Sequence, residues 1–176
     1  MQDPTGAILA ALQFAAHKHR DQRRKDLEAS PYINHPIALA NVLWDEGRVH
    51  DAAVICAALL HDTIEDTETT AEEIRLAFGV KIAHIVEEVS DDKNLDKATR
   101  KRLQVEHAPL ISREAKLVKL ADKICNLRDM AVSPPKTWPK SRVREYFDWA
   151  KAVVDGLRGA HPRLEAIFDE AYGRKP

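Results

Sequence analysis

The amino-acid sequence predicts an all-α protein folded as a single compact domain over residues 1–176. Apolar residues recur at the three- and four-residue spacing of amphipathic helices in almost every segment. No segment of useful length alternates polar and apolar residues as a strand does, and there is no internal repeat. Capping residues and prolines separate the apolar stripes, as expected of successive helices. A chain of 176 residues is within the usual size of one domain.

The composition is that of an ordinary globular protein. Hydrophobic residues make up 44% of the chain and charged residues 31%, and the net charge is −1. This balance creates no global field directed at nucleic acid or an anionic membrane, so neither is expected as a partner. No apolar run reaches the length of a membrane span, and the start of the chain lacks the basic leader of a signal peptide. Cys56 and Cys125 lie among apolar residues at helical spacing, which indicates reduced core cysteines and a cytoplasmic location. The oligomeric state stays open.

Helix signals in the first half of the chain begin at Asp3 and Pro4, a capping residue followed by a first-turn proline. Pro31 and Pro36 indicate stiff, extended backbone between them, and Gly47 ends the helix that follows. We therefore expect, in chain order, a helix with the stripe Ile8, Leu12, Ala15, Ala16 and His19, a polar loop over 20–30, an extended segment over 32–35, a helix over 36–46 and a buried helix over 52–67.

The second half continues the same pattern. Thr70 and Glu73 have the spacing of a capping box, and Ser112 is placed to cap a long apolar helix. We expect a short helix to Phe78 ended by Gly79, a helix over 82–89, a charged loop over 90–96, a mainly polar helix to Pro109, the long helix after Ser112, a proline-rich break over 133–139 and two final helices.

The segment 52–67, with the sequence AAVICAALLHDTIEDT, organises the chain. It is apolar on all sides, as a buried helix is, and it ends in four ionisable residues. If the helix continues, His61 and Glu65 lie one turn apart, as do Asp62 and Asp66, so all four share one side. Buried charge requires a compensating partner, and metal coordination is one of the few that suffice. The alternative is a solvated acidic helix end with a capping aspartate.

Four residues on three segments have the character of metal ligands: His35, His61, Asp62 and Asp122. The backbone around His35 is stiffened by proline, although a single histidine there is also explained as a cap or a core residue. Asp122 interrupts the mostly apolar stretch LVKLADKICNL, where it needs a partner; a salt bridge to a nearby lysine is the alternative. Two histidines and two aspartates form a mixed donor set that suits manganese, iron or zinc.

The order His35, His61-Asp62, Asp122 resembles the H…HD…D pattern of the HD-domain metal-dependent phosphohydrolases. The stretches HRDQRRKD, PYINHP, HDTIEDT, LADKICNLRDM and REYFDWA are similar to the hydrolase domain of the RelA/SpoT homologues, above all to the small alarmone hydrolases. The resemblance implies an all-helical HD-domain fold and a single Mn²⁺ ion. It also implies hydrolysis of the 3′-pyrophosphate of guanosine tetraphosphate or pentaphosphate, the alarmones of the stringent response, to GDP or GTP and pyrophosphate.

The resemblance also implies residue roles. His35, His61, Asp62 and Asp122 become metal ligands, Glu65 and Asp66 become catalytic carboxylates, and Asn126 becomes a nucleotide contact. Two crowded carboxylates have separated pKa values, which allows one base and one acid, but the sequence does not assign these roles. The long relatives carry synthetase and regulatory domains. This chain stops at Pro176, so the resemblance implies a hydrolase domain only.

A highly anionic nucleotide requires cations around the site. The densest basic stretch is HKHRDQRRK, where Arg20, Arg23, Arg24 and Lys25 are candidate phosphate ligands or, alternatively, a solvated basic helix end. A second basic run comprises Lys97, Arg100, Lys101 and Arg102; a solvated face is the favoured reading, although Lys97 and Arg100 follow a loop that is placed to border a pocket. Tyr32 either stacks on the base or packs in the core. Arg142 and Tyr146 share a helix face away from the apolar stripe, available to a ligand or to solvent.

Two other functions stay open. On the same metal site, the chain is a candidate hydrolase of adenosine alarmones or an NADPH 2′-phosphatase, an activity associated with animal members of the family. The other alternative is a non-catalytic nucleotide-binding protein that retains the fold, which the full set of proposed ligands and carboxylates disfavours. Base preference and the physiological metal are not decided by the sequence.

Overall fold

The computed structural model describes residues 3–26 and 28–176, and these residues confirm the all-α prediction. Apart from one isolated bridge between Arg23 and Pro31, the described residues form helices and connecting loops. The elements in chain order are α1 (Pro4–Lys18), α2 (Asn34–Asn41), the π-helix η1 (Val42–Glu46), α3 (Ala52–Leu60), α4 (Thr63–Asp66), α5 (Ala71–Phe78), α6 (Val80–Val89), α7 (Lys97–His107), α8 (Arg113–Val132), α9 (Lys140–Asp155) and α10 (Pro162–Tyr172).

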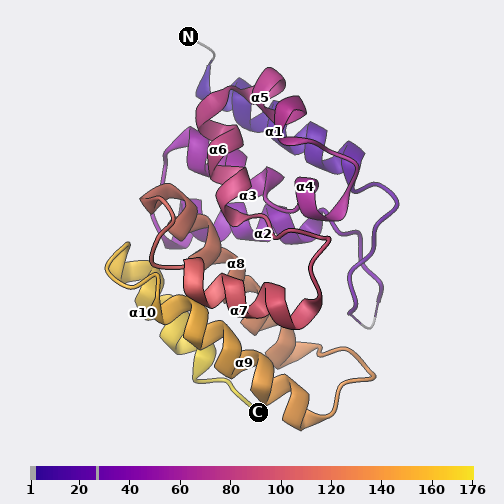
Figure 1. Ribbon diagram of the computed structural model, residues 1–176, viewed down its shortest axis with the longest axis vertical. Coiled ribbons are helices and arrows are strands. Elements are labelled where there is room, and N and C mark those ends of the chain that lie inside the picture. Colours follow the sequence, from indigo (N-terminus) through magenta and orange to yellow (C-terminus); the bar gives the residue numbers. More distant parts are fainter. Residues whose placement is uncertain (1–2, 27) are drawn as a thin grey trace.

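Helix α3 lies at the centre of the molecule, with α1, α2, α6 and α8 packed around it (Figure 1). Every residue from Val54 to Leu60 is buried, as the apolar sequence predicts. Small residues make this close packing feasible, since Ala57 and Ala58 of α3 and Ala11 and Ala15 of α1 are all fully buried. Helices α9 and α10 pack on α8 at the end of the molecule away from α1 and α5. The core therefore holds α3 rigidly and fixes where its C-terminal end points.

The expectation of one continuous helix over 52–67 is wrong. Helix α3 ends at Leu60, His61 and Asp62 form a turn, and the short helix α4 begins at Thr63. Side chains form hydrogen bonds with backbone carbonyl groups at this point. His61 Nδ1 lies 2.8 Å from the Ala58 carbonyl oxygen, and the Thr63 hydroxyl donates to the Leu60 carbonyl oxygen at 2.6 Å. Such local bonds compete with the helix and bend it. The turn therefore gives α4 a direction of its own.

The segment expected to be extended is also different. Ile33 has φ −56° and ψ −23°, and α2 already begins at Asn34, so His35 lies in its first turn rather than before the helix. Pro36 is accepted there because a first-turn residue has no backbone hydrogen bond to lose. The C-terminal part of the expected helix is the π-helix η1, after which Gly47 ends the element as predicted. Starting a helix at this point buries the His35 ring.

Several other predicted boundaries agree with the structure. The Thr70 and Ser112 side chains accept hydrogen bonds from the backbone N–H groups of Glu73 and Ala115, and so cap α5 and α8. Cys56 and Cys125 are buried and free. The predicted loop over 20–30 is present, except that Leu27 lies outside the described residues. Within the described part of the chain, no helix combines the length and apolar character needed to cross a membrane.

Leu60 tests whether the core positions the end of α3. Its side chain is fully buried, so Leu60→Ala is expected to lower the free energy of unfolding by about 2–5 kcal/mol, because it leaves a cavity that the packed helices fill only in part. Urea denaturation measures the change. Leu76→Ala is the matched control: Leu76 is 74% exposed, and the change should cost less than about 0.5 kcal/mol. Equal effects at both positions would contradict this account of the core.

Candidate metal centre and active site

Four predicted ligand residues from three segments meet at the end of α3. Ligand atoms of His35, His61 and Asp62 all lie within 4.8 Å of one another. Asp122, from the middle of α8, joins them: its Oδ1 lies 3.1 Å from His35 Nε2 and 3.9 Å from His61 Nε2. Both histidines are buried, and neither aspartate is more than one-fifth exposed at its side chain. The fold thus brings together the set that the sequence leaves on separate segments.

The donor chemistry of this cluster fits a divalent cation. His61 Nδ1 is occupied by the Ala58 carbonyl, which directs Nε2 toward the carboxylates. Among the described residues, His61 Nε2 is buried without a properly formed hydrogen bond, although Asp62 Oδ2 is only 2.8 Å away. Two imidazole nitrogens and two carboxylates are a usual set for manganese, iron or zinc. The residues present therefore suit a single metal ion.

Electrostatics in the cluster favour ionised carboxylates. Burial by itself lowers the pKa of His61, but the charge of Asp62 and its close contact with the ring outweigh burial and raise that pKa to about 9. Burial opposes ionisation of Asp122, yet the charge of Lys123 and the contact with His35 hold its pKa well below the usual range. The carboxylates are thus ready to bind a cation, whereas His61 must first lose a proton.

Three neighbours hold the aspartates in place. The Tyr32 hydroxyl donates a hydrogen bond to Asp62; burial and the Asp62 charge raise the Tyr32 pKa, so the phenol stays protonated. Lys123 Nζ lies 3.0 Å from Asp122 Oδ2 and Asn126 Nδ2 lies 2.7 Å from Asp122 Oδ1. The salt bridge to a lysine, which is the alternative explanation for Asp122, is therefore present, and Asp122 also belongs to the histidine–aspartate cluster. Of these three contacts, the sequence indicates only the one between Lys123 and Asp122, because the two residues are adjacent.

Glu65 and Asp66 point to different neighbours, because successive residues of the short helix α4 lie about 100° apart around its axis. Glu65 faces α7, where Arg100 Nη1 lies 2.9 Å from its Oε1. Burial, followed by the charges of Asp91 and Asp62, raises the Glu65 pKa to about 7. Asp66 is exposed and accepts a hydrogen bond of 3.1 Å from Gln22 Nε2. The two carboxylates thus have different surroundings, and no local pattern in the sequence indicates Gln22 or Arg100 as their partners.

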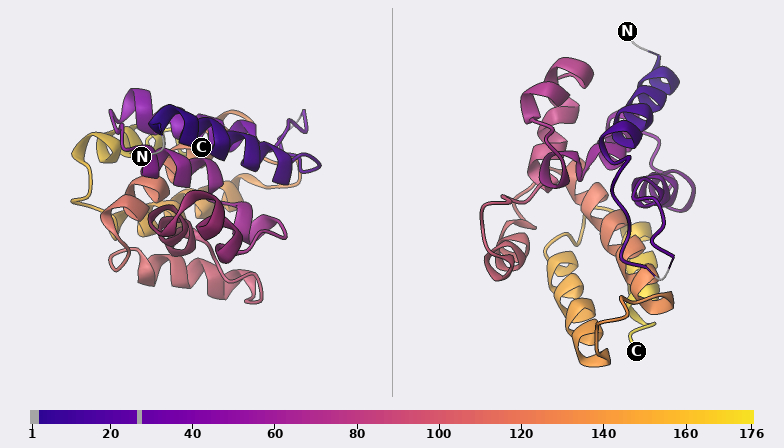
Figure 2. Two further views of the ribbon diagram at one scale, coloured as in Figure 1. Left: turned by 90° about the horizontal axis from the view of Figure 1, so that it is seen from above. Right: turned by 90° about the vertical axis from the view of Figure 1, so that its right-hand side faces the viewer.

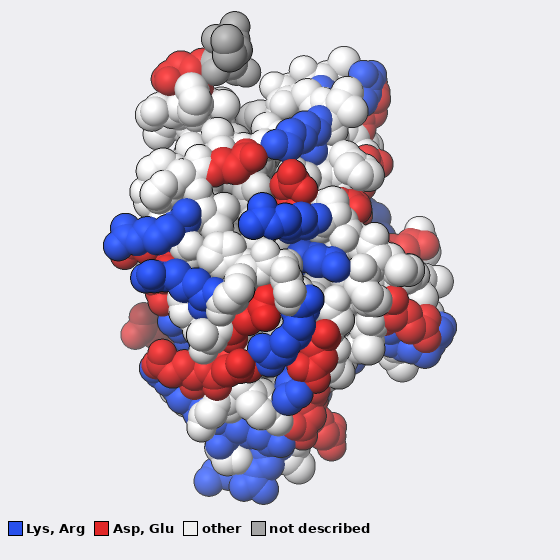
Figure 3. All heavy atoms as spheres, turned by 90° about the vertical axis from the view of Figure 1, so that its left-hand side faces the viewer, with Lys and Arg blue, Asp and Glu red and all other residues white. Residues whose placement is uncertain are grey.

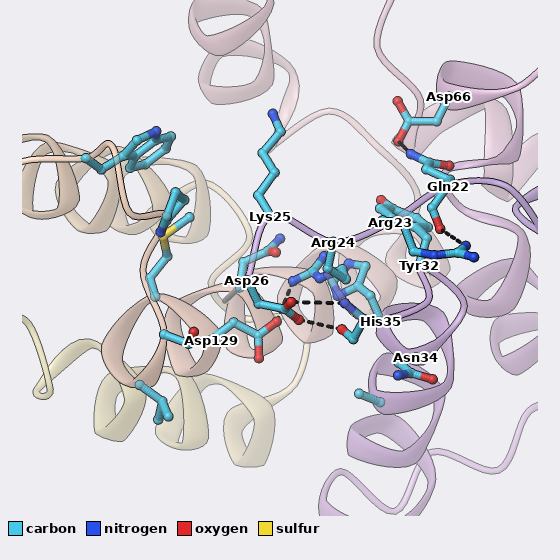
Figure 4. Close-up of a pocket in the computed structure, with 18 of the residues that line it drawn as sticks. Gln22, Arg23, Arg24, Lys25, Asp26, Tyr32, Asn34, His35, Asp66 and Asp129 are labelled. Atoms are coloured by element: carbon cyan, nitrogen blue, oxygen red, sulfur yellow. Dashed lines mark hydrogen bonds and ion pairs between the residues drawn. The ribbon is translucent and has the colours of Figure 1, made fainter. Parts of the chain in front are cut away.

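A cavity of about 650 Å³ adjoins the cluster, and many predicted substrate contacts line it (Figure 4). Arg24 forms an ion pair with Asp129 and lies over the Tyr32 ring, 5.8 Å from its centroid. Figure 4 shows the Lys25 side chain extended away from Asp26 and Asp129. The lining combines the basic loop, the cluster and α8; of the residues predicted from sequence it includes Arg23, Arg24, Lys25, Tyr32, His35, Asp66, Lys97 and Asn126. Arg20 is not among the lining residues; its guanidinium bonds to the His17 carbonyl oxygen.

A second cavity of about 240 Å³ shares Lys97 and Trp138 with the first. Arg142 and Tyr146, predicted to lie on a free helix face, both line it, and the Arg142 guanidinium lies 4.2 Å from the centre of the Trp138 ring. The favoured expectation of a solvated basic run over 97–102 is wrong in part. Arg102 does face solvent, but Lys97, Arg100 and Lys101 line this cavity. The site therefore has cations from three separate segments along its walls.

Elsewhere, positive and negative side chains are interspersed on the face shown in Figure 3, with no large area of one sign. This agrees with the net charge of −1. The concentration of cations at the cavities is thus a local feature of the site.

The described helices and the buried histidine–aspartate cluster are those of an HD domain. A family model for the HD domain matches residues 11–148, which is most of the chain.

Relatives narrow the family. The chain is 56% identical over 172 residues to guanosine-3′,5′-bis(diphosphate) 3′-pyrophosphohydrolase MESH1 of Xenopus tropicalis, covering 98% of this chain and 96% of that one. It is 55% identical over 175 residues to the human MESH1 protein, covering 99% and 98%. A solved structure, of a metazoan orthologue of SpoT that hydrolyses ppGpp and plays a role in starvation responses, superposes with a TM-score of 0.94 at 46% identity, covering 99% and 98%. The chain belongs to the HD-domain hydrolases of the RelA/SpoT-homologue family.

Proton competition at His61 makes metal binding depend on pH. Because the pKa of His61 is about 9, its neutral, metal-binding fraction falls about tenfold for each pH unit below that value. The apparent dissociation constant for Mn²⁺ should therefore rise about tenfold per unit between about pH 8 and about pH 6. Calorimetry in buffers of different ionisation enthalpy measures both the affinity and the protons released. An affinity that is flat across this range would show that His61 loses no proton on binding.

Proposed function

We propose that this chain is a metal-dependent pyrophosphohydrolase that removes the 3′-pyrophosphate of guanosine tetraphosphate or pentaphosphate. The observation that carries the proposal is the convergence of His35, His61, Asp62 and Asp122 beside a cavity with cationic walls. The names of the relatives support the same reaction. In it, the oxygen of a water molecule attacks the phosphorus bound to the ribose 3′-oxygen, and the bond to that oxygen breaks. GDP or GTP and pyrophosphate leave.

The metal in this proposal is a single Mn²⁺ ion held by His35, His61, Asp62 and Asp122. When bound, such an ion lowers the pKa of its water from 15.7 toward about 7 in the best zinc sites, and relieves negative charge at phosphorus. Tyr32, Lys123 and Asn126 keep the two aspartates oriented through the contacts described above. Such supporting contacts typically change metal affinity or activity tenfold to a hundredfold.

Glu65 and Asp66 take different parts in the proposed chemistry. A pKa of about 7 lets Glu65 accept and return a proton near neutral pH, which is the property a general base needs. Asp66 lines the larger cavity and is exposed, so it is placed to orient water or substrate there. This division follows from the two environments on either side of α4.

Substrate contacts fall into two groups. Arg24, Lys25, Tyr32 and Asn126 line the larger cavity and are proposed to hold the nucleoside and its 5′-phosphates. Lys97, Arg142 and Tyr146 line the smaller cavity and are proposed to hold the 3′-pyrophosphate. Arginine is well suited to such contacts because its guanidinium binds phosphate through two donors.

We further propose that residues 1–176 work as one hydrolase domain in the cytoplasm, without a nucleic-acid or membrane partner. The two buried, free cysteines agree with a reducing compartment. The balanced surface charge agrees with a small-molecule substrate.

A substrate panel tests the reaction. With Mn²⁺, the protein should convert guanosine tetraphosphate to GDP and release pyrophosphate rather than orthophosphate, as measured by chromatography of the products. Asp122→Asn removes one negative ligand and should lower bound metal and turnover together. Adenosine alarmones and NADPH belong in the same panel. Orthophosphate release from NADPH with no turnover of guanosine substrates would replace the proposal by a 2′-phosphatase, and metal binding without turnover of any substrate would favour a binding protein.

Glu65→Gln and Asp66→Asn separate proton chemistry from metal binding. Each variant keeps the shape of the side chain, so bound metal and nucleotide affinity should stay close to those of the native protein. Turnover should fall roughly a hundredfold or more, the usual scale of general acid–base catalysis, and Glu65→Gln should lose a limb of the pH profile. Metal analysis and single-turnover rates on the same preparations give both quantities. Full rescue by excess Mn²⁺ would mean that these carboxylates bind the ion instead.

A further inference from the structure

Helix α7 is the least buried of the long helices, yet it reaches the active site. None of its residues, all of which are described, is fully buried. It lies at the edge of the molecule in both views of Figure 2. Its inward side carries Val105, which packs against the core, and the polar side chains of Arg100 and Gln104, which are one helical turn apart and only partly exposed. Because α7 has few apolar contacts, the polar contacts of Arg100 and Gln104 form a large part of its attachment to the rest of the molecule.

Arg100 is committed to Glu65. Its Nη1 lies 2.9 Å from Glu65 Oε1, and the two side chains are 30% and 21% exposed. Arg100 Nε and Gln104 Oε1 are buried, and within the described residues neither makes a hydrogen bond.

The second oxygen of Glu65 is held from the loop before α7. The Asp91 backbone N–H lies 3.3 Å from Glu65 Oε2, and Asp91 Oδ2 accepts a hydrogen bond of 2.6 Å from Gln104 Nε2. Arg100 and Gln104 are therefore tied to Glu65 by two routes, one direct and one through Asp91. Both carboxylate oxygens are fixed, so the carboxyl group has one orientation.

We propose that Arg100 is a positioning residue that holds the Glu65 carboxylate in its working orientation. The inference rests on the proposed hydrolase function, in which Glu65 moves the proton. Arg100 also lines the smaller cavity, beside Lys97 and Arg142, so the competing role is direct contact with substrate phosphate. The two roles differ in what they change: positioning acts on the chemical step, and phosphate contact acts on substrate affinity.

The charges that face Glu65 set the expected pH effect. They are Asp62 and Asp66 beside α4, Asp91 in the loop, Arg100 on α7 and Lys119 on α8. Three of these are negative, and Glu65 forms its ion pair with Arg100. A nearby positive charge favours the ionised carboxylate, so removing Arg100 should raise the pKa of Glu65. If Glu65 works as the ionised base, the acidic limb of the kcat profile then moves to higher pH.

The test compares Arg100→Gln and Arg100→Lys with Arg102→Gln. Arg102 lies on the same helix but pairs with Glu106 at the surface, so it is a matched control for loss of an arginine from α7. In Arg100→Gln, kcat should fall roughly 10- to 100-fold, the scale of misplacing a catalytic group, with KM within about threefold of the native value. Arg100→Lys keeps the charge and should restore the pH limb and part of kcat. Metal content and thermal unfolding should match those of Arg102→Gln.

A double-mutant cycle completes the test. If Arg100 acts through Glu65, then adding Arg100→Gln to Glu65→Gln should change the rate by less than about threefold, because the group it positions is already inactive. Independent, multiplicative losses would overturn the inference, as would a raised KM with kcat unchanged. If Glu65→Gln is impaired but Arg100→Gln is as active as Arg102→Gln, the inference fails and the proposed function stands. If Glu65→Gln is fully active, Glu65 is not part of the chemistry, and its proposed role fails first.

Discussion

The burial of ionisable groups at the end of α3 is the constraint on which the rest of this structure depends. His35, His61, Asp62 and Asp122 are charged or strongly polar, and they are largely buried at the edge of a closely packed core. Such groups are stable only when each has a partner, so the surrounding elements are shaped to supply one. Helix α8 illustrates this, because it carries buried lysines in its middle, where an ordinary core helix would be apolar. A bound cation would interact with the ligand atoms of the cluster that these protein partners leave without a hydrogen bond.

The turn at His61 and Asp62 divides the site into two parts. On one side of it the histidine–aspartate cluster lies in the core, and on the other α4 presents Glu65 and Asp66 to different neighbours. A continuous helix would have placed all the carboxylates on one face, where their mutual repulsion would raise the cost of ionising any of them. The break thus lets one segment of six residues, His61 to Asp66, serve both as a source of ligands and as a source of proton-transfer groups.

Sequence reasoning succeeded where the signal is local. Helical periodicity and caps predicted most elements, and Asp122 stood out because a carboxylate in an apolar stripe needs explanation. The turn after Leu60 was missed, since it depends on how the Thr63 hydroxyl competes for a carbonyl in the packed structure. The bonds of Tyr32 to Asp62 and of Arg100 to Glu65 join residues 30 and 35 positions apart. No local pattern encodes such pairs, so the sequence favours a solvated surface for the polar run on α7.

The length of helix α8 limits the size of the ligand that can fill the larger cavity. The helix runs without interruption from Arg113 to Val132 and presents Asp122 to the cluster and Asp129 to the larger cavity. Seven residues of α-helix rise about 10 Å, and a packed helix does not stretch. The distance along α8 between Asp122 and Asp129 is therefore fixed. A ligand that contacts both the histidine–aspartate cluster and the Arg24 and Asp129 pair must span about that distance. Shorter phosphate compounds would engage one end of the cavity only.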